Sequence, residues 1–326
     1  MKEKLKKDLF HLYKTTSFIK KKTKTSFIVI LIDILWCYIF YSANYNEYRI
    51  FEFYKISHKN RKTYLTKRKY YSIIRNLNNS EDINILKNQS IFYEKFNKYL
   101  KREIYDISKM SFKESELFLK NNPEIICTSY DSNSKYEKLN VKDYRSPAFM
   151  IEYMKQNKLF IMQKPILEHK MMVDINKYSM NYISIVTLYY NDDVNIIFSS
   201  IKFGSKDEYI YNIDESNPIM GKIDEENSCI YTICKDEKGM SYKEHPITKI
   251  KFDKYKVPRF NEALNLVKSL AKQIQDVKLI EWRIMISKTG PILMEAVQWE
   301  DYYFSQLSVN NKNKEGLLPL FNKILK

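Results

Sequence analysis

The stretch from Leu279 to Gln298 restricts the fold more than any other part of the chain. Apolar and polar residues alternate through its first half, which is the pattern of a half-buried strand. Lys288-Thr289-Gly290 then predicts a turn, and a second alternating strand follows it. A three-residue loop would set four pairs of residues opposite one another: Arg283 and Glu295, Glu281 and Val297, Met285 and Leu293, and Ser287 and Pro291.

This register places a cation and a carboxylate side by side on a mostly apolar hairpin. A charge in such surroundings needs a partner or a metal ion, because removing it from water is costly. We therefore expect Arg283 and Glu295 to interact. From these residues alone, a surface ion pair on an edge hairpin, which contributes little to stability, stays the alternative.

Length and composition limit the class of protein. The 326 residues are enough for two or three subdomains with cores of their own. The 4 cysteines have no metal-ligand spacing, and reduced thiols are typical of a cytoplasmic protein. The 5 glycines are isolated, which excludes a G-x-G-x-x-G loop and a P-loop.

The net charge of +16 raises nucleic acid and anionic membranes as partners. Lys, Asn, Ile and Tyr are abundant along the whole chain, so we attribute much of the charge to a composition bias and do not expect a nucleic-acid partner. Residues 55–75 interleave basic residues with tyrosines, as single-strand binders do. A solvated helical face with its tyrosines turned inward is the favoured interpretation there.

The N-terminal region combines a basic segment with an apolar one. Residues 1–24 hold nine lysines, and an apolar run interrupted by Asp33 follows from Ser26 to Ser42. At about 15 residues the run is shorter than the about 20 that a spanning helix needs, and a charge within a span is costly. Three interpretations stay open: a membrane anchor, an interfacial helix that places residues 1–42 on an anionic membrane surface, and a helix buried in a globular domain.

The C-terminal hairpin also carries a family resemblance. Glu281-Trp282-Arg283 and Glu295-Ala296-Val297 resemble the G-W-D and E-x-N motifs of ATP-grasp proteins, in the branch associated with sugar transfer in surface-polysaccharide gene clusters. Further matches follow the family's order over residues 33–307. The first of them, residues 33–54, resembles the helical segment with which this branch of the family begins. This match favours a helix buried in a globular domain for residues 26–42.

The resemblance implies an α+β fold with two ATP-grasp-like α/β subdomains whose antiparallel sheets face a cleft. A helical, basic N-terminal region over residues 1–80 precedes them. The smaller subdomain then covers residues 81–165, and the C-terminal subdomain covers residues 166–326.

The resemblance also implies ATP and Mg²⁺ as cofactors. Glu295 stands at a metal-binding and catalytic position, and Asn212 at a second catalytic position. Lys87, Gln163 and Lys164 stand at nucleotide-binding positions. From the residues alone, Lys87 is better explained as a solvent-exposed lysine on a helix.

Five positions depart from the family pattern. Thr128 stands in place of a phosphate-binding lysine, Lys164 in place of a hinge glutamate, and Ser184 in place of an arginine. Arg283 stands in place of a metal-binding aspartate, and Val297 in place of a metal-binding asparagine. A threonine lacks the charge of lysine, and an ammonium group cannot accept a hydrogen bond. We therefore predict a degraded Mg–nucleotide site in which Arg283 fills the place of the metal and pairs with Glu295.

Three functional interpretations stay open, and with them the question of catalysis. The first is an accessory protein of cell-surface polysaccharide assembly that binds biosynthesis proteins or a sugar-linked substrate. The second is an ATP-dependent carboxylate ligase or transferase whose nucleotide is held by Lys87, Lys164 and Glu295. The third is a basic nucleic-acid or membrane-surface module in residues 1–75. The expected location is the cytoplasm, with or without membrane association.

Overall fold

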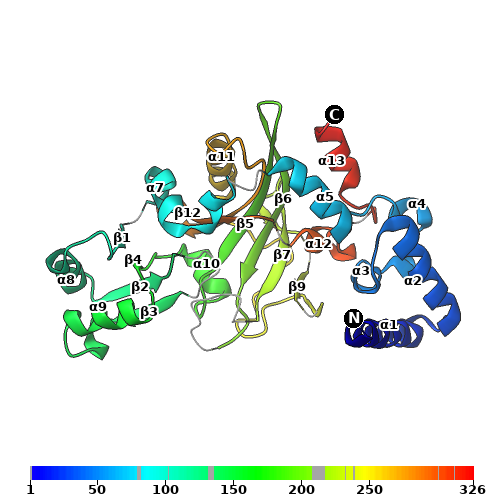
Figure 1. The fold of residues 1–326 in the computed structure, drawn as a ribbon, viewed down its shortest axis with the longest axis horizontal. Helices are drawn as coiled ribbons and strands as arrows, with labels where there is room; N and C mark the ends of the chain where they lie inside the picture. The colour runs from blue at the N-terminus through cyan, green and yellow to red at the C-terminus, as the bar shows by residue number, and fades with distance from the viewer. Residues whose placement is uncertain are drawn as a thin grey trace. The chain divides into compact units, whose positions relative to one another are not determined.

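The computed structural model describes residues 2–78, 82–101, 103–130, 136–207, 217–231, 233–237, 239–299, 301–311 and 313–326 (Figure 1). The chain divides into two compact units, Met1–Leu77 with Glu300–Lys326 and Asn78–Trp299. The second unit is therefore inserted into the sequence of the first. The three-part division predicted from the sequence stays a prediction.

The first unit is helical throughout its described residues. Its elements are α1 (Lys2–Thr23), α2 (Phe27–Tyr41), α3 (Tyr45–Ile50), η1 (Phe53–Lys55), α4 (His58–Arg61), α5 (Lys67–Leu77), α12 (Tyr302–Ser305), η4 (Ser308–Asn310) and α13 (Leu318–Ile324). Helix α3 begins at a capping box, in which the Asn44 side chain accepts hydrogen bonds from the backbone N–H groups of Asn46 and Glu47, and the Glu47 carboxylate accepts one from the Asn44 backbone N–H. The helical N-terminal region expected from the sequence is confirmed.

The apolar run after the basic segment forms α2, which has one buried face and one exposed face. Ile30, Ile34, Cys37 and Tyr41 are buried among aromatic side chains of the same unit. The opposite face is exposed, so the expectation of a buried globular helix holds for half of α2 only. Within the described residues, no helix has the length and apolar content needed to cross a bilayer.

The C-terminal segment is fastened to the segment before α5. Gln306 accepts a hydrogen bond from the Leu65 amide at 2.7 Å and donates one to the Leu65 carbonyl at 3.0 Å. The Gly316 amide donates to Thr63 Oγ1 at 2.7 Å. A Cβ at Gly316 would lie 2.2 Å from Tyr64 Cα, so only glycine fits this approach.

The second unit contains two antiparallel sheets among its described residues. The smaller has the strand order β1-β4-β2-β3, and the larger has the order β10-β9-β7-β6-β5-β11-β12 with β8 paired to β7. The strands are β1 (Ile104–Asp106), β2 (Glu124–Thr128), β3 (Glu137–Asn140), β4 (Ile161–Gln163), β5 (Tyr182–Tyr190), β6 (Asp193–Phe203), β7 (Ile219–Asp224), β8 (Cys229–Ile230), β9 (Cys234–Asp236), β10 (Ser241–Tyr242), β11 (Leu279–Ser287) and β12 (Gly290–Val297). The α+β class with antiparallel sheets is confirmed.

The second unit also contains helices. They are α6 (Asn84–Lys87), α7 (Gln89–Leu100), α8 (Phe112–Asn121), η2 (Val141–Asp143), α9 (Pro147–Gln156), α10 (Lys170–Ile175) and α11 (Phe260–Ala271). Helices α8 and α9 cover the smaller sheet (Figure 1). Phe118 of α8 and Met150 of α9 belong to the same core cluster as Ile125 and Met162 of the sheet. Residues 84–106 form two helices and a strand in place of one continuous helix. Asn88 caps a new helix start at α7, and Lys101 ends that helix in the left-handed conformation.

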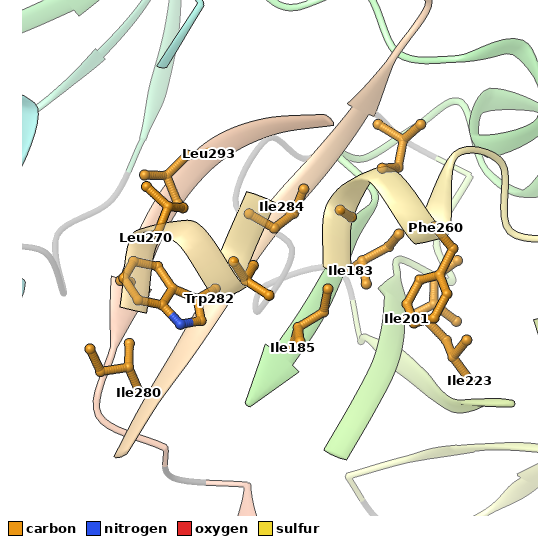
Figure 2. Close-up of a cluster of buried hydrophobic side chains, with 14 of the residues drawn as sticks. Ile183, Ile185, Ile201, Ile223, Phe260, Leu270, Ile280, Trp282, Ile284 and Leu293 are labelled. Carbon is orange, nitrogen blue, oxygen red and sulfur yellow. The ribbon is translucent and has the colours of Figure 1, made fainter. Parts of the chain in front are cut away.

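The hairpin of β5 and β6 lies in the middle of the larger sheet. Asn191 and Asp192 both have positive φ, as a tight two-residue hairpin turn requires. Figure 2 shows α11 laid over this sheet, with Phe260 and Leu270 among isoleucines of β5, β6 and β11. Trp282 is fully buried there and donates its indole N–H to Thr187 Oγ1 at 2.8 Å. This packing fixes β11, which carries the candidate site on its other face.

Candidate functional site

The hairpin of β11 and β12 has the predicted pairing at one end and a different register at the other. Arg283 lies opposite Glu295, and Glu281 lies opposite Val297, as expected. A β-bulge at Met294 then shifts the register. The pairings predicted for Met285 and Ser287 are therefore wrong.

Met285 pairs with Ile292, and Ser287 pairs with Gly290 across a two-residue turn. The extra residue in β12 compensates for a turn one residue shorter than the sequence suggested. Ser287 also supports this turn, since its hydroxyl accepts a hydrogen bond from Thr289 N at 3.2 Å. The bulge thus preserves the pairing of the two charged residues.

Arg283 interacts with both neighbouring glutamates. Its Nη1 lies 2.7 Å from Glu295 Oε1, and its Nε lies 3.6 Å from Glu281 Oε1. Ser184, opposite Arg283 on β5, donates its hydroxyl to Glu281 Oε1 at 2.6 Å. The structure thus brings together residues from three separate sequence motifs, and the predicted pairing of Arg283 with Glu295 is confirmed.

The cluster is withdrawn from water. The side chains of Arg283, Glu295 and Glu281 are 21%, 13% and 4% exposed. Burial opposes the charged form of Arg283, but Tyr182 and the two carboxylates outweigh it, so the pKa of Arg283 is raised well above its ordinary value. Arg283 is thus a permanent cation at this position.

These residues do not fit a magnesium ion. Mg²⁺ requires several oxygen ligands around it, and a guanidinium group is a cation that repels it. Here Arg283 already engages one oxygen of Glu295. Within the described ranges, no three His, Cys, Asp or Glu side chains are grouped so that they could hold a metal ion.

Gln163 is the sequence-predicted nucleotide-binding residue with unused hydrogen-bonding groups. It ends β4, is 1% exposed, and neither its Nε2 nor its Oε1 has a partner among the described residues. A buried amide without partners is costly, and such groups often mark a site that a ligand completes. Gln163 therefore fits contact with a polar ligand such as a nucleotide base.

The other predicted nucleotide-binding residues are used differently. Lys164 pairs with Glu103 at 2.6 Å near the surface. Lys87 ends α6 with its side chain exposed, as the residues alone suggested. Thr128 is buried at the end of β2. Asn212 lies outside the described residues.

A separate carboxylate–amide pair was not predicted as a site from the sequence. Glu168 accepts a hydrogen bond from Asn181 Nδ2 at 2.9 Å, and its backbone forms a bridge with Ser287. Burial raises the pKa of Glu168 to about 7, while hydrogen bonds from Asn181 partly oppose the rise. Glu168 and Asn181 are 13 residues apart, and no periodicity links them. Only the fold reveals this pair.

Comparison with known families gives one match. The sequence model of a family described as sugar-transfer associated ATP-grasp matches residues 130–326. No curated protein sequence matches the chain.

Solved structures with a similar fold have very low sequence identity to this chain. The ATP-grasp ligase PsnB complexed with a minimal precursor is 8% identical, with a TM-score of 0.45 over 76% of this chain and 64% of that chain. D-alanine–D-alanine ligase from Bacillus anthracis is 11% identical, with a TM-score of 0.45 over 76% and 69%. N5-carboxyaminoimidazole synthase from Aspergillus clavatus is 9% identical, with a TM-score of 0.40 over 68% and 47%. The chain thus spans less than two thirds of the PsnB and synthase chains.

Proposed function

The chain belongs to the sugar-transfer associated ATP-grasp family, and we propose that it acts in cell-surface polysaccharide assembly as an accessory protein without a working Mg–ATP site. It binds a biosynthesis protein or a sugar-linked substrate rather than activating a carboxylate with ATP. One observation carries this proposal. Arg283, which the family resemblance sets at the position of a metal-binding aspartate, forms a 2.7 Å ion pair with Glu295.

The physical argument concerns charge. ATP-dependent ligation needs cations that neutralise the phosphates and stabilise the charge that shifts during transfer. A divalent ion can bridge protein and phosphate oxygens, whereas a guanidinium group already paired with Glu295 and close to Glu281 neutralises protein carboxylates instead. The cluster therefore supports a fold that is stable without Mg–nucleotide.

A nucleotide titration with and without Mg²⁺ tests the proposal. We expect no Mg-dependent binding of ATP to the wild-type chain by calorimetry, and no thermal shift. Arg283→Asp places a third carboxylate beside Glu295 and Glu281, so this variant should acquire a stabilisation by Mg²⁺ that the wild type lacks. Millimolar or tighter ATP binding by the wild type that depends on Mg²⁺ would refute the proposal. If Arg283→Asp does not fold, the wild-type titration decides alone.

A second candidate function is an ATP-dependent ligase or transferase with rearranged ligands. The unpartnered amide of the buried Gln163 supports it, because that amide fits a nucleotide base. This candidate would be favoured if Gln163→Leu abolishes ATP binding. The control is Gln156→Leu on the exposed face of α9, which should leave ATP binding intact. Turnover of ATP in the presence of an amine and a carboxylate would establish it.

A further inference from the structure

Helix α2 is apolar on the face where a globular helix is normally polar. Its outward stripe consists of Ile28, Ile32, Leu35 and Ile39, which are 66%, 59%, 48% and 69% exposed. Their spacing of four, three and four residues places them on one line along the helix. A helix that is apolar all round belongs in an apolar environment, and the described part of the chain covers only the opposite face.

Aromatic residues border this stripe. Trp36 and Phe40 are 46% and 59% exposed, and their ring centroids lie 4.1 Å apart. Tyr38 is 64% exposed on the other side of the stripe. Scattered apolar residues are normal on a protein surface, but a contiguous patch of this kind marks an interaction site. Trp and Tyr also favour the boundary between lipid and water.

Helix α1 adds positive charge next to this patch. Among its described side chains, exposed lysines alternate with the exposed Leu9, Phe10, Tyr13 and Phe18, and Asp8 is the acidic residue. The Tyr13 ring lies 5.7 Å from the Phe27 ring at the start of α2. Helix α1 and the start of α2 are therefore neighbours at this contact.

A cationic hollow lies on α1. It has a volume of about 460 Å³ and includes His11, Lys14, Lys21 and Arg49 in its lining. Tyr13 also lines it, which connects the hollow to the contact with α2. Among the described residues that line it, none is acidic. This charge suits the phosphate group of an anionic lipid.

We propose that α1 and α2 dock the chain on the surface of a membrane that contains anionic phospholipid. The stripe of α2 lies among the outer parts of the acyl chains, and the lysines of α1 face the phosphates. Helix α2 has 15 residues and is therefore about 22 Å long, less than the about 30 Å of a hydrocarbon core, so it lies in the plane of the interface.

The charge pattern favours a membrane over two other occupants. A second copy of the chain, packed symmetrically, would bring the lysines of α1 against the same lysines of its partner. A nucleic acid would be attracted to the lysines but would gain nothing from the stripe of Ile28, Ile32, Leu35 and Ile39. An anionic bilayer satisfies the charged helix and the apolar helix together.

Vesicle sedimentation with the full chain tests this docking. The vesicles contain phosphatidylcholine alone, or equal amounts of phosphatidylcholine and phosphatidylglycerol. We expect binding to the anionic vesicles that weakens with added salt, and binding at least about tenfold weaker to the neutral ones. Ile28→Ser/Ile32→Ser/Ile39→Ser should lower binding at least about tenfold. Lys14→Gln/Lys21→Gln should lower it about fivefold for each lysine.

Matched variants of equally exposed residues serve as controls. Ile91→Ser/Leu117→Ser/Leu167→Ser and Lys142→Gln/Lys155→Gln change the second unit and should leave binding unchanged. Circular dichroism checks that each variant is folded. If the triple α2 variant is unfolded, the single variant Ile32→Ser is used in its place. Three results would overturn the proposal: no binding of wild type to anionic vesicles, equal binding by the α2 variant, or an α2 variant that only converts a dimer to a monomer. Binding of single-stranded RNA that depends on Lys14 and Lys21, without vesicle binding, would also overturn it.

Discussion

Two buried arginines, one in each unit, differ in how fully they are satisfied. In the first unit Arg61 binds both oxygens of Asp33, at 2.6 and 2.9 Å, and its Nε donates to the carbonyls of Phe53 and Ile56. In the second unit Arg283 makes a 2.7 Å hydrogen bond to Glu295, and its Nε lies 3.6 Å from Glu281 Oε1. Neither this Nε nor the second oxygen of Glu295 has a hydrogen-bond partner in the described structure.

Arg61 has the bidentate geometry and backbone contacts of a residue that holds one local structure in place. Arg283 makes one short ion pair and leaves the second oxygen of Glu295 without a hydrogen bond among the described residues. The proposed loss of the Mg–nucleotide site would account for this difference.

The largest expected effect comes from Arg283→Met. It leaves Glu281 and Glu295 buried, close together and without a cation, which should lower the free energy of unfolding by about 3–5 kcal/mol at neutral pH. Urea unfolding followed by the fluorescence of Trp282 measures the change. Arg259→Met, which removes a more exposed pair with Glu262, is the control. A loss of less than about 1 kcal/mol would mean that the cluster is an ordinary surface ion pair.

Arg61→Met should have a somewhat smaller effect, about 2–4 kcal/mol. Asp33 is 24% exposed, so water can replace part of what it loses, but two backbone carbonyls also lose their donor. Hydrogen–deuterium exchange should accelerate across α2 and η1, and it should stay unchanged in β11. Equal acceleration in both units would contradict the division of the chain into two compact units.

Glu168 is a largely buried carboxylate that is hydrogen-bonded by Asn181. Its folded pKa of about 7 lies above the ordinary 4.5, so between these pH values the folded chain keeps a proton that the unfolded chain has lost. The free energy of unfolding should therefore fall as pH rises through this window, by up to about 3 kcal/mol, and then level off. Glu168→Gln should flatten the dependence of the free energy of unfolding on pH, whereas the control Glu94→Gln, at an exposed residue, should leave this dependence unchanged. A slope of the opposite sign in the wild type that Glu168→Gln removes would contradict the assignment.

Ser184→Ala is the mildest change to the Arg283 cluster. It removes the 2.6 Å hydrogen bond to Glu281, and the expected loss is about 1–2 kcal/mol because the acceptor is charged and buried. A double-mutant cycle with Arg283→Met should show coupling, since both residues contact the same carboxylate. Independent effects would indicate that Ser184 supports the sheet rather than the cluster.

The sequence predicted those parts of the molecule that depend on local patterns. The alternation of β11 and β12 predicted their hairpin, and the predicted pairing of Arg283 with Glu295 holds because the shorter turn and the bulge compensate for each other. The bulge at Met294 was not visible, because it keeps the strand character on both sides and changes only the register.

Other features depend on contacts between distant segments. Ser184 and Glu281 are 97 residues apart, so their hydrogen bond follows from the order of strands in the sheet. The exposed face of α2 was also hidden from the sequence, because an apolar run reads the same whether one face or both faces are covered. Family motifs located the hairpin, but they did not reveal Glu168 or the missing partners of Gln163.

The inserted second unit has a consequence for biosynthesis. Residues that fasten the first unit, Gln306 on Leu65 and Gly316 beside Thr63, are translated only after the whole second unit. The second unit can therefore fold while the first still waits for its closing segment, which reverses the usual order in which domains mature on the ribosome. During that interval α1 and α2 have already left the ribosome. The apolar face of α2 is therefore exposed on the nascent chain before the first unit can complete its fold.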